Sequence, residues 1–358
     1  MTFDEARAQF PVFERYAYLN AGTNGPLARP AVEAMVAQER ADLERGRGGY
    51  PYFEGALELR ERVRTKLAAV VGVGPECLSL ATSTTSGCNI VLAGLGLRPD
   101  DEVVTTDGEH FGLLGALAAS AARVRVAPVR ELPPEESLEV LLREVTPRTR
   151  LLALSHVCWM TGNRFPVEEL KREAGLPVLV DGAQSVGAVP VDATRVDYYA
   201  FSCQKWLCGP DATGGLVVLD ADSLPVTAPS YLSQERYEPT GEFTPRAGAA
   251  RYDANWTPVP SLAGLDAALD CAPEWRFERA AEATAHCREL LDGCAEVVTA
   301  PEQGTLVTFR FGGDTTELVR RLYDRGVIVR DLPGTGWLRV SCGWWNDEED
   351  VERLVAAL

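Results

Sequence analysis

The sequence predicts an α/β fold in which a large domain with a mainly parallel seven-stranded sheet precedes a small C-terminal α+β domain. The chain has 358 residues, more than one ordinary domain. In its first two thirds, short apolar runs without polar alternation are separated by helix-like segments. That pattern is typical of parallel strands covered on both faces. After about Asn255 the alternation ends, which indicates a second, smaller unit.

Seven apolar runs are predicted to be the buried strands: Cys77–Ala81, Glu102–Thr106, Arg123–Val129, Leu151–Val157, Pro177–Asp181, Tyr198–Ser202 and Gly214–Leu219. Helix-like stretches such as Ser86–Gly94 and Pro166–Ala174 separate several of them. The C-terminal part is predicted to begin with a long helical stretch, Pro260–Ala295, followed by a strand, Leu306–Phe311, and a helix, Thr315–Arg325. Two short strands and a closing helix, Asp347–Leu358, are expected to follow. We expect a large domain over 15–257, a small domain over 258–358, and an N-terminal segment, 1–14, that packs on the small domain.

Composition excludes several classes of partner. The chain carries 52 acidic and 35 basic side chains, a formal charge of −17, which disfavours nucleic acid and anionic membranes. No apolar run approaches the ~20 residues that span a bilayer. The N-terminus lacks the pattern of a signal peptide, and the nine scattered cysteines show no disulfide framework, so we expect a cytoplasmic protein. With three histidines and no CxxC or HxxxH spacing, no metal site is expected.

One of the three lysines stands apart from the others. Lys66 and Lys171 lie in charged, helix-like stretches, whereas Lys205 follows a predicted strand and has apolar neighbours such as Trp206. Loss of hydration lowers the pKa of a lysine amine and favours the neutral nucleophile that Schiff-base chemistry requires. On local sequence alone, a lysine that snorkels from a strand end explains the pattern equally well.

A carboxylate ends the neighbouring apolar strand. Asp181 is followed by Gly182 in a tight turn, at the strand end where open parallel sheets bind ligands. A buried carboxylate is costly without a cationic partner, and the protonated ring nitrogen of pyridoxal 5′-phosphate (PLP) is such a partner. Gln184 is positioned to donate to the ring hydroxyl oxygen. The alternative is that Asp181 only caps the next helix.

A phosphate site is predicted after the first strand. Ser83, Thr84 and Thr85 precede a helix whose free N–H groups, together with these hydroxyls, suit a phosphate dianion. Ser202, just before the lysine, adds a hydroxyl. A simple helix cap is the alternative. His110 follows the second strand, where its imidazole can stack on the cofactor ring, although an isolated histidine is more often structural.

Longer segments resemble the class V aminotransferase family of fold-type-I PLP-dependent enzymes. DGAQSVGAVPVD and FSCQKWLCGPDATGGLVVL are similar to its cofactor core, YLNAGTNGPL to its substrate-side segment, and RYDANWTP to the segment that its dimers exchange. The similarity covers nearly the whole chain. It implies a PLP-dependent transferase fold, PLP as cofactor, an amino acid as substrate, and a homodimer with a shared active site.

The resemblance also assigns roles to single residues. It implies Lys205 as the Schiff-base lysine, Asp181 on the ring nitrogen and His110 above the ring as the catalytic set. It implies that Asn20 lies on the substrate side and that Arg330 or Arg339 takes the substrate carboxylate. The cofactor-binding set is then Ser83, Thr84, Thr85, His110, Asp181, Gln184, Ser202, Lys205 and, from the other subunit, Thr257.

Several reactions remain open within this family. Gln204 and Trp159 resemble the isopenicillin N epimerase-like branch, because cysteine desulfurases have His and Asn at these positions. The stretch RDLPGTGWLRVS lacks the mobile cysteine of the desulfurases, and Cys342 is expected in the core.

Transamination ranks first and β-elimination by a C–S lyase second. Epimerisation needs a second acid, for which Tyr50, Tyr52, Cys208 and His110 are the candidates. A PLP-fold sensor without turnover is the non-enzyme alternative. A dinucleotide-binding dehydrogenase is excluded, because Gly94 and Gly96 are not followed by the third glycine of its fingerprint.

Overall fold

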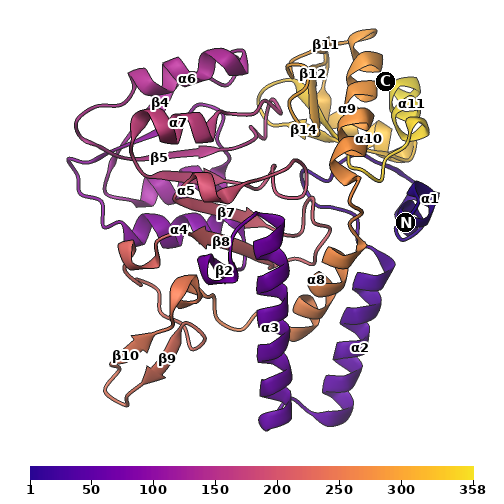
Figure 1. The fold of residues 1–358 in the computed structure, drawn as a ribbon. Coiled ribbons are helices and arrows are strands. Elements are labelled where there is room, and N and C mark those ends of the chain that lie inside the picture. The colour runs from indigo at the N-terminus through magenta and orange to yellow at the C-terminus, as the bar shows by residue number, and fades with distance from the viewer.

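The computed structural model describes residues 1–358 and is built around a seven-stranded sheet (Figure 1). Only β8 runs antiparallel to its neighbours, so the mainly parallel sheet predicted from the sequence is confirmed. Along the sheet the strands are β2 (Leu78–Ala81), β8 (Gly214–Val218), β7 (Tyr198–Ser202), β6 (Val178–Asp181), β5 (Thr149–Ser155), β3 (Glu102–Thr106) and β4 (Arg123–Ala127).

Helices bury both faces of this sheet. Because side chains alternate along a strand, Val178 and Val180 of β6 join one core while Leu179 joins the other. This two-sided burial explains why the strands read as continuous apolar runs. The first core includes α3 (Tyr50–Val70), α6 (Pro134–Arg143) and α7 (Val167–Ala174), and the second includes α4 (Thr84–Gly94) and α5 (Phe111–Ala119).

The C-terminal part forms a second, smaller sheet with its own core. Its antiparallel strands follow the order β11 (Glu296–Val297), β12 (Leu306–Arg310), β15 (Trp337–Ser341) and β14 (Arg330–Leu332). Its helices are α9 (Arg276–Asp292), α10 (Thr315–Asp324) and α11 (Glu348–Ala357). Near the N-terminus, β1 (Ala17–Tyr18) pairs with β13 (Val327–Ile328).

The first residues of the chain lie against this smaller unit (Figure 1). After α1 (Phe3–Arg7), a 3₁₀ turn covers Pro11–Glu14. The Arg7 guanidinium donates to the Asp350 carboxylate at 2.8 Å, and the Phe10 ring packs edge-on to Trp344. The domain boundaries after residues 14 and 257 stay a prediction.

One long helix predicted in the C-terminal part is wrong. Instead, α8 (Val259–Cys271) ends before Pro273, and α9 begins at Arg276. Proline lacks a backbone N–H and clashes with the preceding turn, which explains the break. The helix α8 packs against α3 and against α2 (Arg29–Arg45). Separately, β9 (Gln234–Tyr237) and β10 (Phe243–Pro245) form a hairpin that projects away from the seven-stranded sheet (Figure 1).

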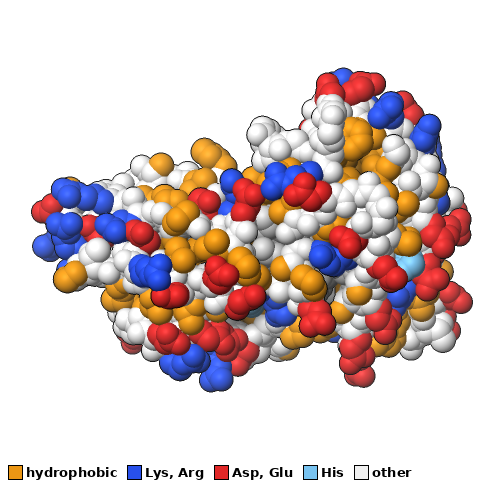
Figure 2. All heavy atoms as spheres, turned by 90° about the horizontal axis from the view of Figure 1, so that it is seen from above, with side chains coloured by type: hydrophobic (Ala, Val, Ile, Leu, Met, Phe, Trp, Pro, Cys, Tyr) orange, Lys and Arg blue, Asp and Glu red, His pale blue; other side chains and the backbone are white.

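Most strand boundaries differ by one or two residues from those predicted. The strand β5 ends at Ser155 although the apolar run continues to Val157, which is buried in the following turn. An apolar run shows which residues are buried, not which ones form the hydrogen bonds of a strand. The run that ends at Val157 is therefore longer than the strand itself. No helix is long and apolar enough to cross a bilayer. Acidic side chains are spread over the face seen in Figure 2, interspersed with basic and hydrophobic ones.

Candidate active site

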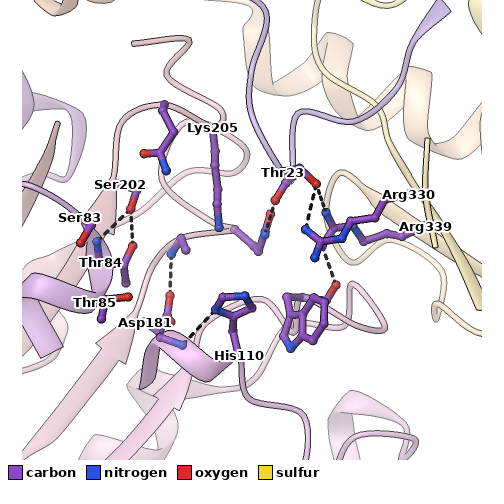
Figure 3. Close-up of a pocket in the computed structure, with 16 residues that line it drawn as sticks. Thr23, Ser83, Thr84, Thr85, His110, Asp181, Ser202, Lys205, Arg330 and Arg339 are labelled. Atoms are coloured by element: carbon purple, nitrogen blue, oxygen red, sulfur yellow. Dashed lines mark hydrogen bonds between the residues drawn. The ribbon is translucent and has the colours of Figure 1, made fainter. Parts of the chain in front are cut away.

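A cavity of about 220 Å³ opens at the carboxyl ends of β5, β6 and β7, where ligands of parallel sheets bind. It is bordered by the small sheet through β14 and β15. In Figure 3, Lys205 extends into the middle, with hydroxyl side chains on one side and two arginines on the other. The lining residues are Gly22, Thr23, Ser83, Thr84, Thr85, His110, Gly112, Trp159, Asp181, Ala183, Gln184, Ser202, Gln204, Lys205, Arg330 and Arg339.

Lys205 follows β7 in a loop that the N-terminal segment holds closely. The Gly25 N–H donates to the Gln204 carbonyl at 2.7 Å, and a Cβ at Gly25 would lie 1.9 Å from the Lys205 carbonyl oxygen. Burial, together with the charges of Arg339 and Arg330 and against the opposing charge of Asp181, lowers the pKa of Lys205 to about 8. The amine therefore has an appreciable neutral, nucleophilic fraction near pH 7.

Asp181 ends β6 with its carboxylate buried beneath the cavity. The Oδ1 atom accepts from the Ala183 N–H at 2.9 Å, and no cation binds the carboxylate directly. Burial raises the pKa of Asp181, and the positive charge of Lys205 opposes that shift. Gln184 also lines the cavity, held by donation from its Nε2 to the Gly22 carbonyl and by the Trp206 indole N–H at its Oε1.

A cup of hydroxyl and N–H groups lies at the start of α4. Ser202 Oγ is 2.9 Å from both the backbone nitrogen and the Oγ1 of Thr84. Ser83 is the N-cap of the helix, so the N–H groups of its first turn face this cup. Ser83, Thr84, Thr85 and Ser202 all line the cavity, as Figure 3 shows.

His110 caps α5 beside the cavity and is held in one tautomer. Its Nδ1 accepts from the Gly112 N–H at 3.1 Å, which leaves the proton on Nε2. Burial lowers the pKa of His110 to about 4, helped by the charges of Lys205 and the two arginines, so the ring is neutral at pH 7. Its ring lies edge-on to the Trp159 ring at 5.1 Å.

A second buried carboxyl, which the sequence reasoning missed, precedes His110. Glu109 accepts from the Thr106 hydroxyl at 2.6 Å and from the backbone and side chain of Ser155 at 3.0 and 2.5 Å. It therefore ties the end of β3 to the end of β5, where Ser155 is the register partner of Asp181. Only its position before a functional histidine signals it in the sequence.

The two predicted carboxylate-binding arginines both reach the cavity. Arg339 is fully buried, donates to the Trp159 carbonyl at 2.9 Å and keeps its Nε without a partner. Burial lowers the pKa of Arg339 to about 9, and the charge of Arg330 adds to this. The Arg330 guanidinium lies over the Trp159 ring, 5.7 Å from its centroid. Neither arginine pairs with a carboxylate of the chain, so an anionic ligand suits both.

Two predicted residues lie outside the cavity of their own chain. Asn20 does not line the cavity but contacts a residue that does: its Oδ1 accepts from the Thr23 hydroxyl at 2.8 Å. Thr257 is buried beside a separate surface depression that includes Phe53 and Trp256. Conversely, Thr23 lines the cavity and was missed, although it lies three residues after Asn20 in the predicted substrate-side segment.

The donor set of the cavity fits PLP. A hydroxyl and N–H cup suits its phosphate, and the buried, cation-free carboxylate of Asp181 suits a protonated ring nitrogen. Lys205 extends into the middle of the same cavity and presents an amine for its aldehyde. These three groups come from the ends of different strands, so only the folded sheet brings them together.

Comparisons with known proteins agree with this geometry. The family model described as aminotransferase class-V matches residues 18–354. The chain is 31% identical to the isopenicillin N epimerase of Streptomyces clavuligerus, over 99% of this chain and 97% of that protein. It is 28% identical to the cysteine desulfurase of Salmonella agona (strain SL483), over 100% of this chain and 98% of that one.

Solved structures extend the likeness. A C-DES mutant with glycine covalently linked to its PLP cofactor superposes with a TM-score of 0.91 at 29% identity, covering 98% of both chains. C-DES is also solved as a cystine C–S lyase in complex with its product, cysteine persulfide, with a TM-score of 0.91 over 97% of this chain and 98% of that one. The fold and the PLP cofactor predicted from the sequence are thereby confirmed.

Proposed function

The chain belongs to the class V aminotransferase family and is a PLP-dependent enzyme, and we propose that it is a lyase that removes the β-substituent of a sulfur-containing amino acid. The likeness to the cystine C–S lyase C-DES carries the choice of reaction, and the cavity fits it with two arginines and a lysine but no thiol among its lining residues. Sulfur released there leaves without transfer to a cysteine of the chain.

The lining residues divide into three roles in this proposal. Ser83, Thr84, Thr85 and Ser202 hold the phosphate, and Gln204 adds an amide at the same side of the cavity. Asp181 keeps the ring nitrogen protonated, while His110 and Gln184 position the ring. When bound, PLP supplies the electron sink for the electron pair left at Cα.

Lys205 and the two arginines then act on the amino acid. Arg330 and Arg339 bind the α-carboxylate and orient the Cα–H bond, as bidentate guanidinium groups do. Lys205 Nζ, which points into the cavity, is the base that would remove the Cα proton. Its lowered pKa of about 8 suits a general base near neutral pH. The surrounding positive charge of the arginines favours departure of an anionic thiolate.

Transamination is the second candidate function, because the same lysine can return the proton to the cofactor carbon instead. The cavity itself does not distinguish these two fates of the carbanion. We place β-elimination ahead because C-DES, with its high overall similarity, is a C–S lyase. Epimerisation has less support from the cavity: of the four candidate second acids only His110, whose pKa burial lowers to about 4, lines it, and Tyr50, Tyr52 and Cys208 do not.

A product assay separates the candidates. PLP-loaded protein is incubated with L-cysteine, L-cystine or S-methyl-L-cysteine, without added keto acid, and pyruvate and ammonia are measured. Equal amounts of both over many turnovers support β-elimination. One equivalent of keto acid per subunit, renewed only when an acceptor keto acid is added, indicates transamination instead. Inversion at Cα without either product indicates an epimerase.

A cysteine variant tests the absence of a sulfur-accepting thiol. Cys342 is buried in the core of the small sheet. Sulfur release by Cys342→Ser should therefore equal that of the wild type once folding is matched by thermal midpoint. Loss of sulfur release in a folded Cys342→Ser protein would instead point to a desulfurase mechanism.

We also propose that the active enzyme is a homodimer. Thr257 lies outside the cavity of its own chain, next to a depression with exposed aromatic and aliphatic side chains. Leu43 is 85% exposed, and Phe53 and Trp256 are 43% and 37% exposed. Such a concentration of apolar surface is typical of a protein–protein interface. We propose that a second copy covers this depression and brings Thr257 of one subunit to the phosphate cup of the other.

A further inference from the structure

The Thr23 hydroxyl uses its full hydrogen-bonding capacity on three partners. It donates to Asn20 Oδ1 at 2.8 Å. It accepts from Arg330 Nη1 at 3.1 Å and from Arg339 Nη2 at 3.3 Å (Figure 3). A hydroxyl has one donor and two acceptor positions, so Asn20 determines where the two lone pairs point. The two guanidinium groups are thereby joined through one oxygen atom.

This arrangement holds two like charges together without a counter-ion. Arg330 and Arg339 are register partners on adjacent strands, and the chain offers neither of them a carboxylate. An arginine side chain has many rotamers, and mutual repulsion would drive the two guanidinium groups apart. The hydroxyl of Thr23 counters both effects. Arg330 makes this single hydrogen bond, so most of its N–H donors remain free for a ligand.

The backbone that carries Thr23 is fixed from both sheets. The Gly22 N–H donates to Ser341 Oγ of β15, and its carbonyl accepts from Gln184 of the large sheet. A Cβ at Gly22 would lie 2.9 Å from Arg339 Nη2, so any side chain there would displace this guanidinium group. Thr23 is therefore held rigidly between the cofactor side and the arginine side of the cavity.

We propose that Thr23 is a positioning residue which, oriented by Asn20, aligns Arg330 and Arg339 to receive the substrate α-carboxylate and so makes the site prefer amino acids over simple amines. The proposal rests on the role assigned above to the two arginines. In the substrate-free protein, the Thr23 hydroxyl already aligns the two guanidinium groups. A residue that only stabilised the fold would affect amino acids and amines alike.

A pair of ligands that differ only by a carboxylate tests the proposal. L-alanine and ethylamine are titrated into PLP-loaded wild type, Thr23→Val and Thr23→Ser, and the change in visible absorbance gives each apparent dissociation constant. Valine keeps the shape of threonine but removes the hydroxyl, whereas serine keeps the hydroxyl. We expect Thr23→Val to weaken L-alanine binding roughly tenfold, as for a lost hydrogen bond to a charged group, and to leave ethylamine within about twofold. Thr23→Ser should behave as the wild type.

A second variant and two controls keep the outcomes distinct. Asn20→Ala removes the acceptor but keeps the hydroxyl, so it should weaken L-alanine binding in the same direction. The thermal midpoint and the PLP dissociation constant of each variant show whether fold and cofactor site are intact.

Three results would overturn the proposal. In the first, Thr23→Val binds L-alanine as tightly as the wild type. In the second, the apparent dissociation constants of L-alanine and ethylamine for Thr23→Val rise by the same factor, which indicates a purely structural role. In the third, the wild type itself does not distinguish the two ligands, which also rejects the role of the arginines. A preference in the wild type that Thr23→Val retains therefore rejects Thr23 alone.

Discussion

Arg330 and Arg339 face each other as register partners across the antiparallel strands β14 and β15. The two strands are joined by a short turn over 333–336, so the pair is nine residues apart in sequence yet shares one hydroxyl acceptor in space. The sequence leaves open whether Arg330 or Arg339 binds the substrate carboxylate. In the structure both are placed to do so. Both border the same cavity, and they differ in how they are held.

That difference predicts unequal effects of substitution. Arg330→Ala removes a half-buried side chain and should weaken amino-acid binding about 10- to 100-fold while preserving the fold. Arg339→Ala should also lower the thermal midpoint, because it empties a fully buried site and leaves the Trp159 carbonyl unpaired. Absorbance titrations with amino acids and thermal melts measure the two effects. Arg320→Ala on the exposed side of α10 is the control.

Lys205→Ala should abolish covalent attachment of the cofactor. No other lysine lines the cavity, so borohydride treatment of the loaded variant should leave no PLP on the protein, as mass spectrometry of the intact chain will show. Lys171→Ala, which removes a partly buried lysine paired with Asp197 outside the cavity, is the control and should retain one PLP. Reducible attachment in the Lys205→Ala protein would reject the assignment.

Asp181→Asn should keep the fold but lose most of the activity. The amide can still accept from the Ala183 N–H, whereas it no longer stabilises a protonated ring nitrogen. We expect kcat to fall by ~10²–10³-fold, the range seen when a preorganised electrostatic group is removed. A steady-state assay of the product gives kcat, and Asp100→Asn at an exposed position is the control. An unchanged kcat would contradict the pairing of Asp181 with the ring.

Glu109 should make the stability of the PLP-free protein depend on pH. Burial raises the pKa of Glu109 from 4.5 to about 7, against the hydrogen bonds from Ser155 and Thr106 and with a smaller contribution from the Asp181 carboxylate. The thiols of Cys88 and Cys158 are the other titratable groups affected by its charge. Between these two pH values the folded protein binds a proton that the unfolded chain has lost, so the stability contributed by this group falls as pH rises through the window.

Comparison with Glu109→Gln isolates this contribution. The thermal midpoint of the wild type relative to the variant should decrease from about pH 5 to about pH 7 and then level off. His110 and His156, whose pKa values burial lowers to about 4, change stability in the opposite direction and cancel in the difference. A difference that stays constant across this range would show that Glu109 is ionised throughout.

Trp256→Glu should dissociate the proposed homodimer and weaken PLP binding together. A charge in the apolar depression beside Thr257 opposes its burial against a second copy. Sedimentation velocity gives the oligomeric state, and a fluorescence titration gives the PLP dissociation constant. Val126→Glu, on the edge strand β4, is the control, since Val126 is also half exposed. Unchanged PLP binding in a monomeric variant would reject a shared site.

The sequence by itself determined the fold class and the group at the centre of the site. Continuous apolar runs predicted strands buried on both faces, because such runs follow from local burial. Lys205 and Asp181 taken alone left structural alternatives open, and only the resemblance of longer segments to a known family predicted PLP. The tertiary structure alone decided how the groups around them are arranged. Glu109, Thr23 and the placement of Asn20 behind the cavity depend on contacts between distant segments. A hydrogen bond between residues more than 300 positions apart, such as that of Thr23 with Arg330, leaves no periodicity or spacing in the sequence.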